Sequence, residues 1–424
     1  MKVFKFGGAS VKNAAAVENV ARILKMFPKD NLVVVVSAMG KMTNALEVLI
    51  DAYVHGHPDK MQRYAEIEIF HREIIKSLDM PSHVSLERVD KLFAELKDRL
   101  EKQVSDNYDY DYDQIIGFGE LISTAIVAVY LGANGLENAW CDARDLIRTD
   151  NAYREARVKW DKTETLIVNR WDHLKQATSG RVIMLTQGFI GHTDERNTTT
   201  LGREGSDFSA AILAYALNAE SVTIWKDVPG MLNADPKYFS DAVMLRRISY
   251  REAIELAYYG ATVIHPKTIK PLQNKSIPLF VKSFIHPGEE GTTIGSSTFS
   301  DSLIPSYIFK VNQVLISITP RDFSFVAEEN LSELFSVFAK ENVKINLMQN
   351  SAINFSVCID FDQQKLDRIL KSCLDKYEVL YNAPCELVTI RHYDQETIER
   401  LLIGKSVIVE QRSRNTARMV LMEG

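Results

Sequence analysis

The stretch Lys2-Val3-Phe4-Lys5-Phe6-Gly7-Gly8-Ala9-Ser10 joins a short apolar strand to a double glycine. Gly7 and Gly8 lack Cβ atoms, so backbone N–H groups in this loop can approach an anion closely. The apolar pattern of residues 11–26 predicts a helix whose N-terminal dipole points at the same place. Lys5, on the strand just before the glycines, can set its ammonium against phosphate oxygens. The loop is therefore interpreted as a phosphate site, although a simple tight turn also uses such glycines.

A second loop, residues 198–207, supports this interpretation because it combines glycines with an arginine and an aspartate and leads into an apolar helical pattern. Together the two loops predict a kinase. Neither a Gly-x-x-x-x-Gly-Lys-Ser/Thr motif nor a complete Gly-x-Gly-x-x-Gly motif is present. The nearest approach, Gly117-Phe118-Gly119, has Ile122 where the third glycine would stand, so neither a P-loop nor a fused dehydrogenase unit is expected.

Composition predicts a globular protein of two or three domains, because the chain has 424 residues and is 46% hydrophobic. A net charge of -6 without a basic block argues against a nucleic-acid partner, and no apolar run is expected to span a membrane. With no signal peptide visible, a cytoplasmic location is expected. Its scattered cysteines (Cys141, Cys358, Cys373, Cys385) and its His residues form no zinc motif, so no protein-ligated metal is expected.

Over residues 1–300, apolar strand-like runs alternate with helical patterns, which is typical of an α/β fold with a mainly parallel open sheet between two layers of helices. Sheets of this kind bind ligands beyond the carboxyl ends of their strands, and the glycine loops follow such ends. The predicted strands are 3–6, 32–36, 181–185, 221–225 and 277–281, and the further predicted helices are 44–54, 60–78, 85–104, 121–131, 208–217 and 251–259.

From residue 301 the glycine loops stop and an α+β region of shorter elements is expected. A βαββαβ unit is predicted over about 313–384, followed by an abbreviated second copy over about 385–424. A short sheet with helices on one face has exposed edges, which pairing between copies or subunits can cover. The region is interpreted either as a dimerisation module or as a sensor for a small ligand.

Six ordered motifs make the chain resemble the aspartate kinases of the amino acid kinase superfamily over essentially its whole length. The motifs lie at residues 5–10, 36–44, 117–120, 200–207, 226–230 and 263–268. The tail resembles the paired regulatory ACT domains of such enzymes, and the strand near 307–311 is expected to join the second ACT sheet. An amino acid effector, lysine or threonine, is implied, with the loops at 319–325 and 349–353 as its candidate lining, and so is a homodimer or higher oligomer formed through this region.

The resemblance implies transfer of the γ-phosphoryl group of MgATP to the side-chain carboxylate of L-aspartate. The products would be ADP and β-aspartyl phosphate, the first intermediate of lysine, threonine and methionine biosynthesis. The residue chemistry agrees, since a carboxylate is ionised at pH 7 and needs no general base, so the site has mainly to position substrates and neutralise charge. Mg²⁺ would be held mainly by phosphates and water.

On the same resemblance, the catalytic residues are Lys5, which stabilises the transferring phosphoryl group, and Asp207, which orients Lys5 or the phosphates. Arg203 offers a planar fork to a substrate carboxylate, and Glu120 accepts the substrate's α-ammonium. For Glu120 and Asp207 the alternatives are ordinary acidic residues at a helix N-terminus, with Asp207 as an N-cap. The expected hydroxyl donors to the amino acid are Ser37, Thr43 and Ser206.

Several nucleotide-binding positions depart from the family's usual residues. Ala9 replaces a common threonine, Glu204 stands where glycine is usual, and Leu232 and Thr262 stand where tyrosine and lysine are frequent. We hypothesise that Lys267 compensates for Thr262. The residues expected near the nucleotide are Lys5, Gly7, Gly8, Ser10, Lys226, Asp227, Leu232, Lys237, Thr262 and Lys267.

Two other functions stay open. A related enzyme acting on glutamate, N-acetylglutamate or UMP would share the glycine loop, but Glu120 together with Arg203 favours a free amino acid. The departures at Glu204 and Thr262 would suit a non-catalytic regulatory protein, whereas retention of Lys5 favours catalysis.

A run of alternating tyrosines and aspartates at residues 108–113 could suggest a metal or recognition site. It is interpreted instead as a solvated loop leading into the Glu120 helix.

Overall fold

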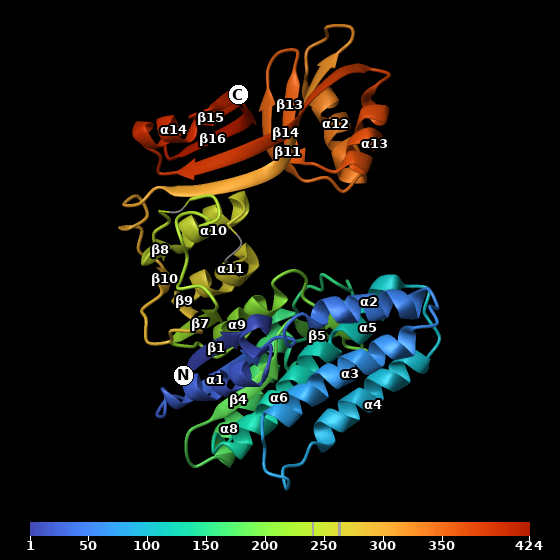
Figure 1. The fold of residues 1–424 in the computed structure, drawn as a ribbon, viewed down its shortest axis with the longest axis vertical. Helices are drawn as coiled ribbons and strands as arrows, with labels where there is room; N and C mark the ends of the chain where they lie inside the picture. The colour runs from blue at the N-terminus through green and yellow to red at the C-terminus, as the bar shows by residue number, and fades with distance from the viewer. Residues whose placement is uncertain (240, 262–263) are drawn as a thin grey trace. The chain divides into compact units, whose positions relative to one another are not determined.

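The computed structural model describes residues 1–239, 241–261 and 264–424 (Figure 1). The chain forms two compact units, which are described separately. The first comprises Met1–Met231, Met244–Ile254 and Val263–Thr298, and the second comprises Leu232–Val243, Glu255–Thr262 and Phe299–Gly424.

The first unit is built on an eight-stranded, mostly parallel sheet with the order β3-β4-β2-β1-β7-β9-β10-β8. Strand β2 is a run of five buried aliphatic residues, as expected for a strand covered on both faces. At the centre, Lys5 on β1 lies between Val35 on β2 and Ile224 on β7. The strands are β1 Lys2–Phe6, β2 Leu32–Val36, β3 Ala139–Cys141, β4 Ile183–Gln187, β7 Ser221–Lys226, β8 Arg247–Ser249, β9 Leu279–Ser283 and β10 Thr292–Gly295.

Helices cover both faces of this sheet. Helix α6 packs on β2, β3 and β4 and contacts α1 and α4, whereas α9 packs on β1, β2 and β7 and contacts α8 and α11. The predicted α/β fold class is therefore confirmed. The helices are α1 Ala14–Lys25, α2 Met42–Val54, α3 Lys60–Ser77, α4 Glu87–Glu101, α5 Tyr108–Ile116, α6 Phe118–Ala133, α7 Ala143–Leu146, α8 Trp160–Ala177, α9 Gly205–Ala216 and α11 Pro266–Asn274. Helix α10, Tyr250–Tyr259, has its residues 250–254 in this unit and the rest in the second. Strands β5 Ile190–His192 and β6 Thr198–Thr200 form a small second sheet.

Two local predictions for this unit were wrong. A 3-10 turn, Gly8–Val11, follows the first loop, and α1 begins only at Ala14, where the Asn13 side chain caps it. The tyrosine–aspartate run is not a loop but the start of α5, because Asn107 caps its first turn and the acidic residues suit a helix N-terminus.

The expectation that no apolar stretch is long enough to span a membrane also needs correction. Among the described residues, the helical stretch Tyr108–Ala133 is long and apolar enough to cross a membrane by length and composition. However, 89% of its apolar window is buried inside the protein, as in a core helix.

The second unit contains a six-stranded antiparallel sheet with the order β12-β13-β11-β14-β16-β15. Strands β11 and β14 each merge two predicted strands, and a register irregularity between Lys310 and Gln313 of β11 marks the join. The elements are β11 Ser306–Pro320, α12 Glu328–Lys340, β12 Ile345–Asn350, β13 Phe355–Asp360, α13 Gln363–Cys373, β14 Tyr377–Arg391, α14 Gln395–Leu401, β15 Lys405–Arg412 and β16 Thr416–Glu423.

Each half of this sheet has its own apolar cluster. Side chains of α12 and α13 cover one half. Over the other half, α14 and three residues of the segment 232–243, namely Ala234, Phe239 and Ala242, pack in one cluster with Tyr307 and Val388. Asn233 fixes this segment, since its side chain donates to the Pro305 carbonyl at 2.9 Å and its own carbonyl accepts the Tyr307 N–H.

We predict that Gly188→Ala destabilises the first unit. Gly188, just after β4, bonds to the Val36 carbonyl, and an added Cβ would lie 2.5 Å from Ser206 Cβ and 2.7 Å from Ser206 Cα at the start of α9. Overpacking against backbone should lower the free energy of unfolding by about 1–3 kcal/mol, measured by urea denaturation. Gly180→Ala is the control, because an added Cβ there meets nothing within 4 Å. Equal stability of the two variants would contradict the prediction.

Candidate active site

The two loops that follow β1 and β2 are locked together by close backbone approach. A Cβ on Gly8 would lie 2.7 Å from the Gly40 carbonyl oxygen, and the Gly40 N–H bonds to the Gly8 carbonyl at 3.0 Å. Ser10 is buried, and its hydroxyl donates to the Trp225 carbonyl at 3.4 Å. Ser10 therefore ties the first loop to β7 in this structure.

Lys5 and Lys226 flank one buried carboxylate. Lys5 Nζ lies 2.6 Å from Asp207 Oδ1, and Lys226 Nζ lies 3.7 Å from Asp207 Oδ2. The adjacent strands β1 and β7 supply the two lysines, and α9, which packs on both strands, supplies the carboxylate. The alternative role of Asp207 as an N-cap was wrong: Glu204 occupies that position, without a side-chain capping bond.

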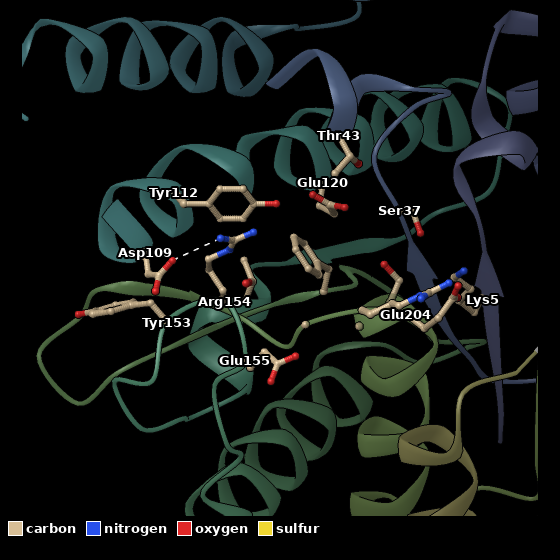
Figure 2. A pocket seen from close by; sticks show the side chains of 16 residues that line it. Lys5, Ser37, Thr43, Asp109, Tyr112, Glu120, Tyr153, Arg154, Glu155 and Glu204 are labelled. Atoms are coloured by element: carbon tan, nitrogen blue, oxygen red, sulfur yellow. Dashed lines mark hydrogen bonds and ion pairs between the residues drawn. The ribbon is translucent and has the colours of Figure 1, made fainter. Parts of the chain in front are cut away.

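A cavity of about 740 Å³ opens beside Lys5 (Figure 2). It brings together Lys5 and every residue predicted to bind the amino acid. Its full lining is Lys5, Ser37, Thr43, Asp109, Tyr112, Glu120, Tyr153, Arg154, Glu155, Phe189, Thr200, Gly202, Arg203, Glu204, Gly205 and Ser206.

Glu120 reaches the cavity from the first turn of α6 and is only 3% exposed. Its Oε1 accepts the Ala38 N–H at 3.3 Å, whereas Oε2 is buried and accepts no hydrogen bond from the described residues. Burial raises the pKa of Glu120 to about 8, even though the Lys5 charge acts to lower it. The free site therefore holds a mostly neutral carboxyl group with an unused oxygen at pH 7.

Gly119 makes this placement possible. A Cβ there would lie 2.9 Å from Leu46 Cδ1 and 3.0 Å from Ala38 Cβ, so a larger residue would force Leu46 or Ala38 to shift where α6 approaches the loop after β2. Ser123, one turn further along α6, donates to the Ser37 carbonyl at 2.7 Å.

The nucleotide-binding predictions are less completely assembled. Lys226 lies beside Asp207, but Gly7, Gly8, Ser10 and Asp227 do not line the cavity. Leu232 and Lys237 belong to the segment 232–243 of the second unit. Thr262 lies outside the described residues.

Lys267 has a more specific position. It lies in the first turn of α11, and its Nζ is 3.6 Å from the place that a Cβ on Gly202 would take. It therefore lies close to the loop that carries Arg203.

Sequence reasoning missed the part of the cavity wall formed by α5 and by the loop around residue 154. These residues are Asp109 and Tyr112 on α5 and Tyr153, Arg154 and Glu155 in the loop. Phe189, which follows β4, and Thr200, at the end of β6, were not predicted as site residues either. Arg154, Phe189 and Glu204 are in the left-handed backbone region, with φ values of 66°, 71° and 56°. Such strain in non-glycine residues often marks functional sites. The tyrosine–aspartate run was the available signal, but it was assigned to solvent.

A group that could hold a metal ion lies elsewhere. Asp51, His55 and His57 are exposed at the end of α2 and do not line the cavity. The helix end and its turn therefore add nothing to the chemistry of this site.

Comparisons with known proteins agree with this geometry. Residues 1–283 match the model of the amino acid kinase family. The lysine-sensitive aspartokinase 3 of Escherichia coli is 31% identical over 84% of this chain and 78% of its own length. Aspartokinase 1 of Arabidopsis thaliana, a chloroplastic protein, is 29% identical over 89% of this chain and 68% of its own length.

Solved structures give the same result. Escherichia coli aspartokinase III in complex with lysine and aspartate matches with a TM-score of 0.82 and 27% identity, over 100% of this chain and 96% of that one. The same enzyme in complex with aspartate and ADP matches with a TM-score of 0.79 and 26% identity, over 99% and 96%. The chain therefore belongs to the amino acid kinase family and, within it, to the aspartokinases.

Proposed function

We propose that the chain transfers the γ-phosphoryl group of ATP to the side-chain carboxylate of L-aspartate in the cavity lined by Lys5, Glu120 and Arg203. The observation that carries this proposal is the buried, mostly neutral Glu120 in the same cavity as an arginine fork. The α-ammonium of an amino acid would give Glu120 a cationic partner, and a carboxylate of the amino acid would bind Arg203. The relative solved with aspartate and ADP supports this choice.

The reaction needs no general base. The β-carboxylate of aspartate attacks the γ-phosphorus, and the bond to the bridging oxygen of ADP breaks. In this proposal Lys5 and Lys226 neutralise charge on the transferring group and Asp207 orients them, which their ion pairs with Asp207 support. Asp207 already pairs with two lysines, so it is not expected to be the main ligand of Mg²⁺. This agrees with a Mg²⁺ ion that would be held mainly by the phosphates of ATP and by water.

The second unit is proposed to sense lysine or threonine. The two candidate loops are adjacent: the Val326 N–H bonds to the Ala352 carbonyl at 2.8 Å, and Asn354 Nδ2 donates to Thr319 Oγ1 at 3.2 Å. The lysine complex of the relative supports an amino acid effector. The same proposal divides this unit into two ACT-like modules and includes a homo-oligomer that forms through it. It also includes a cytoplasmic location and a role in lysine and threonine biosynthesis.

The decisive experiment traps the acyl phosphate with hydroxylamine, with L-aspartate, L-glutamate or N-acetylglutamate as acceptor and MgATP as donor. We expect hydroxamate from aspartate alone and less of it when the effector is added. Lys5→Met should lower the rate by about 100-fold or more, because it removes charge stabilisation of the transferring group. Lys2→Met is the matched control, since Lys2 is on the same strand but pairs with Asp30 at 2.9 Å.

Hydroxamate from glutamate or N-acetylglutamate alone would assign a different acceptor. None from any acceptor, with aspartate still bound, would favour a non-catalytic regulatory protein.

The stability of the free enzyme should depend on the protonation of Glu120. The pKa of Glu120 in the folded protein, about 8, lies above the ordinary value of 4.5. The contribution of Glu120 to the free energy of unfolding is therefore fully present below pH 4.5 and is lost as pH rises through 8. Wild type should therefore lose a few kcal/mol relative to Glu120→Gln between about pH 5 and pH 9, measured as thermal or urea unfolding. Glu155→Gln, an exposed carboxylate of the same cavity, should follow wild type; parallel curves for all three proteins would contradict the assignment.

Lys267→Ala should raise the KM for ATP and leave the KM for aspartate unchanged. The expected increase is roughly tenfold, the size of one lost charge-assisted contact. Lys270→Ala, also exposed and one turn further along α11, is the control. An unchanged KM for ATP in Lys267→Ala would remove the hypothesis that Lys267 compensates for Thr262.

A further inference from the structure

Helix α5 carries two buried carboxylates that bond to different sets of residues. Asp111 and Asp113 both have 0% exposed surface. Asp111 pairs with Arg99 and accepts the Ser105 N–H at 2.8 Å, away from the cavity. Asp113 instead bonds to Thr200 and Arg154, which line the cavity.

Asp113 joins three separate segments of the cavity wall. Its Oδ2 accepts the Thr200 N–H at 2.8 Å and the Arg154 N–H at 2.9 Å, and its Oδ1 accepts the Thr200 hydroxyl at 2.8 Å. The Thr200 carbonyl in turn accepts the Ala156 N–H at 2.9 Å. The end of β6, the loop 150–157 and α5 are therefore connected through one carboxyl group.

Arg154 depends on this support because its backbone is strained. A non-glycine residue at φ 66° persists only where its surroundings hold it. Its guanidinium lies 4.4 Å from the ring centre of Tyr112 and 3.4 Å from Asp109, on the cavity side of α5 (Figure 2). A cation is thus held beside the residues proposed to bind aspartate.

We propose that Asp113 is a positioning residue that sets Thr200 and Arg154 in the wall of the aspartate pocket and thereby determines the affinity for aspartate. This inference rests on the proposed function, because it takes aspartate as the ligand. Asp113 acts through these two neighbours and does not touch the substrate.

The chemistry of the carboxyl group defines a conservative variant. Burial raises the pKa of Asp113 to about 6, with the hydrogen bonds from Arg154 and Thr200 acting in the opposite direction. An asparagine can reproduce all three contacts, since its Oδ1 accepts both N–H groups and its Nδ2 donates to the Thr200 hydroxyl. Alanine loses all three.

The test measures KM for aspartate, KM for ATP and kcat of the full chain by hydroxamate formation, with aspartate binding measured in parallel by calorimetry. In Asp113→Ala the KM and Kd for aspartate should rise roughly 10- to 100-fold, with KM for ATP within about twofold of wild type. Asp113→Asn should restore aspartate affinity.

Asp111→Ala is the matched control. It removes an equally buried carboxylate from the same helix and leaves Arg99 unpaired, so it should destabilise the fold without raising KM for aspartate. If Asp113→Ala does not fold, Thr200→Val removes the hydroxyl contact from the other side and should raise KM for aspartate alone.

Three results would overturn the inference. Unchanged aspartate affinity in Asp113→Ala or, if that variant does not fold, in Thr200→Val would sink it while the proposed function stands. An equal increase in KM for aspartate in Asp111→Ala would reduce Asp113 to a stability role. No hydroxamate from aspartate and no aspartate binding by wild type would remove the proposed function and this inference together.

Discussion

The candidate active site depends on the buried Asp207 carboxylate and the two lysines beside it. A charge without exposed surface is stable only when it is paired, and here the partners come from the adjacent central strands β1 and β7. The ion pairs therefore fix where α9 begins relative to the strand ends. That placement also sets the positions of Arg203, two residues before α9 begins, and of Ser206, in its first turn. A neutral residue at position 207 would remove the ion pairs that Asp207 makes with Lys5 and Lys226, so the site's electrostatics and the packing of α9 are linked.

Glu120 presents the opposite situation in the same cavity. The protein supplies Asp207 with cations but leaves Glu120 with one backbone N–H and a buried, unbonded oxygen. Burial keeps Glu120 mostly neutral, which avoids the cost of an unpaired charge until a cationic ligand group arrives. The cavity thus has a cationic end at Lys5 and, at Glu120, a carboxyl group that is mostly neutral at pH 7 in the free protein. Under the proposed function, this difference would let one pocket favour a free amino acid over an acceptor without an amino group.

The sequence predicted the elements whose chemistry is local and missed those set by tertiary contacts. The loops at the strand ends could be found because close approach of two backbones requires glycine. All residues that were predicted to bind the substrate amino acid line one cavity. The tyrosine–aspartate run was assigned to solvent because burial of Asp113 depends on Thr200 and Arg154, which are distant in sequence. Likewise, the pairs of strands that merge into β11 and β14 looked separate because irregular positions interrupt their apolar alternation. Thr262 lies outside the described residues, so its prediction stays untested.

The merged strands bear on how the second unit can respond to a ligand. Residues 306–310 of β11 pair with 387–391 of β14, and residues 315–320 pair with 377–382, so both halves of the sheet share the same two continuous strands. Packed interiors have low compressibility and transmit strain, so a strand that is held along its length by hydrogen bonds moves as a unit and bends little locally. A ligand at the loops after β11 and β12 would therefore act on both halves together. The register irregularity near Asn312, which has φ 55°, lies between the two paired stretches and interrupts the regular ladder of β11 with β14.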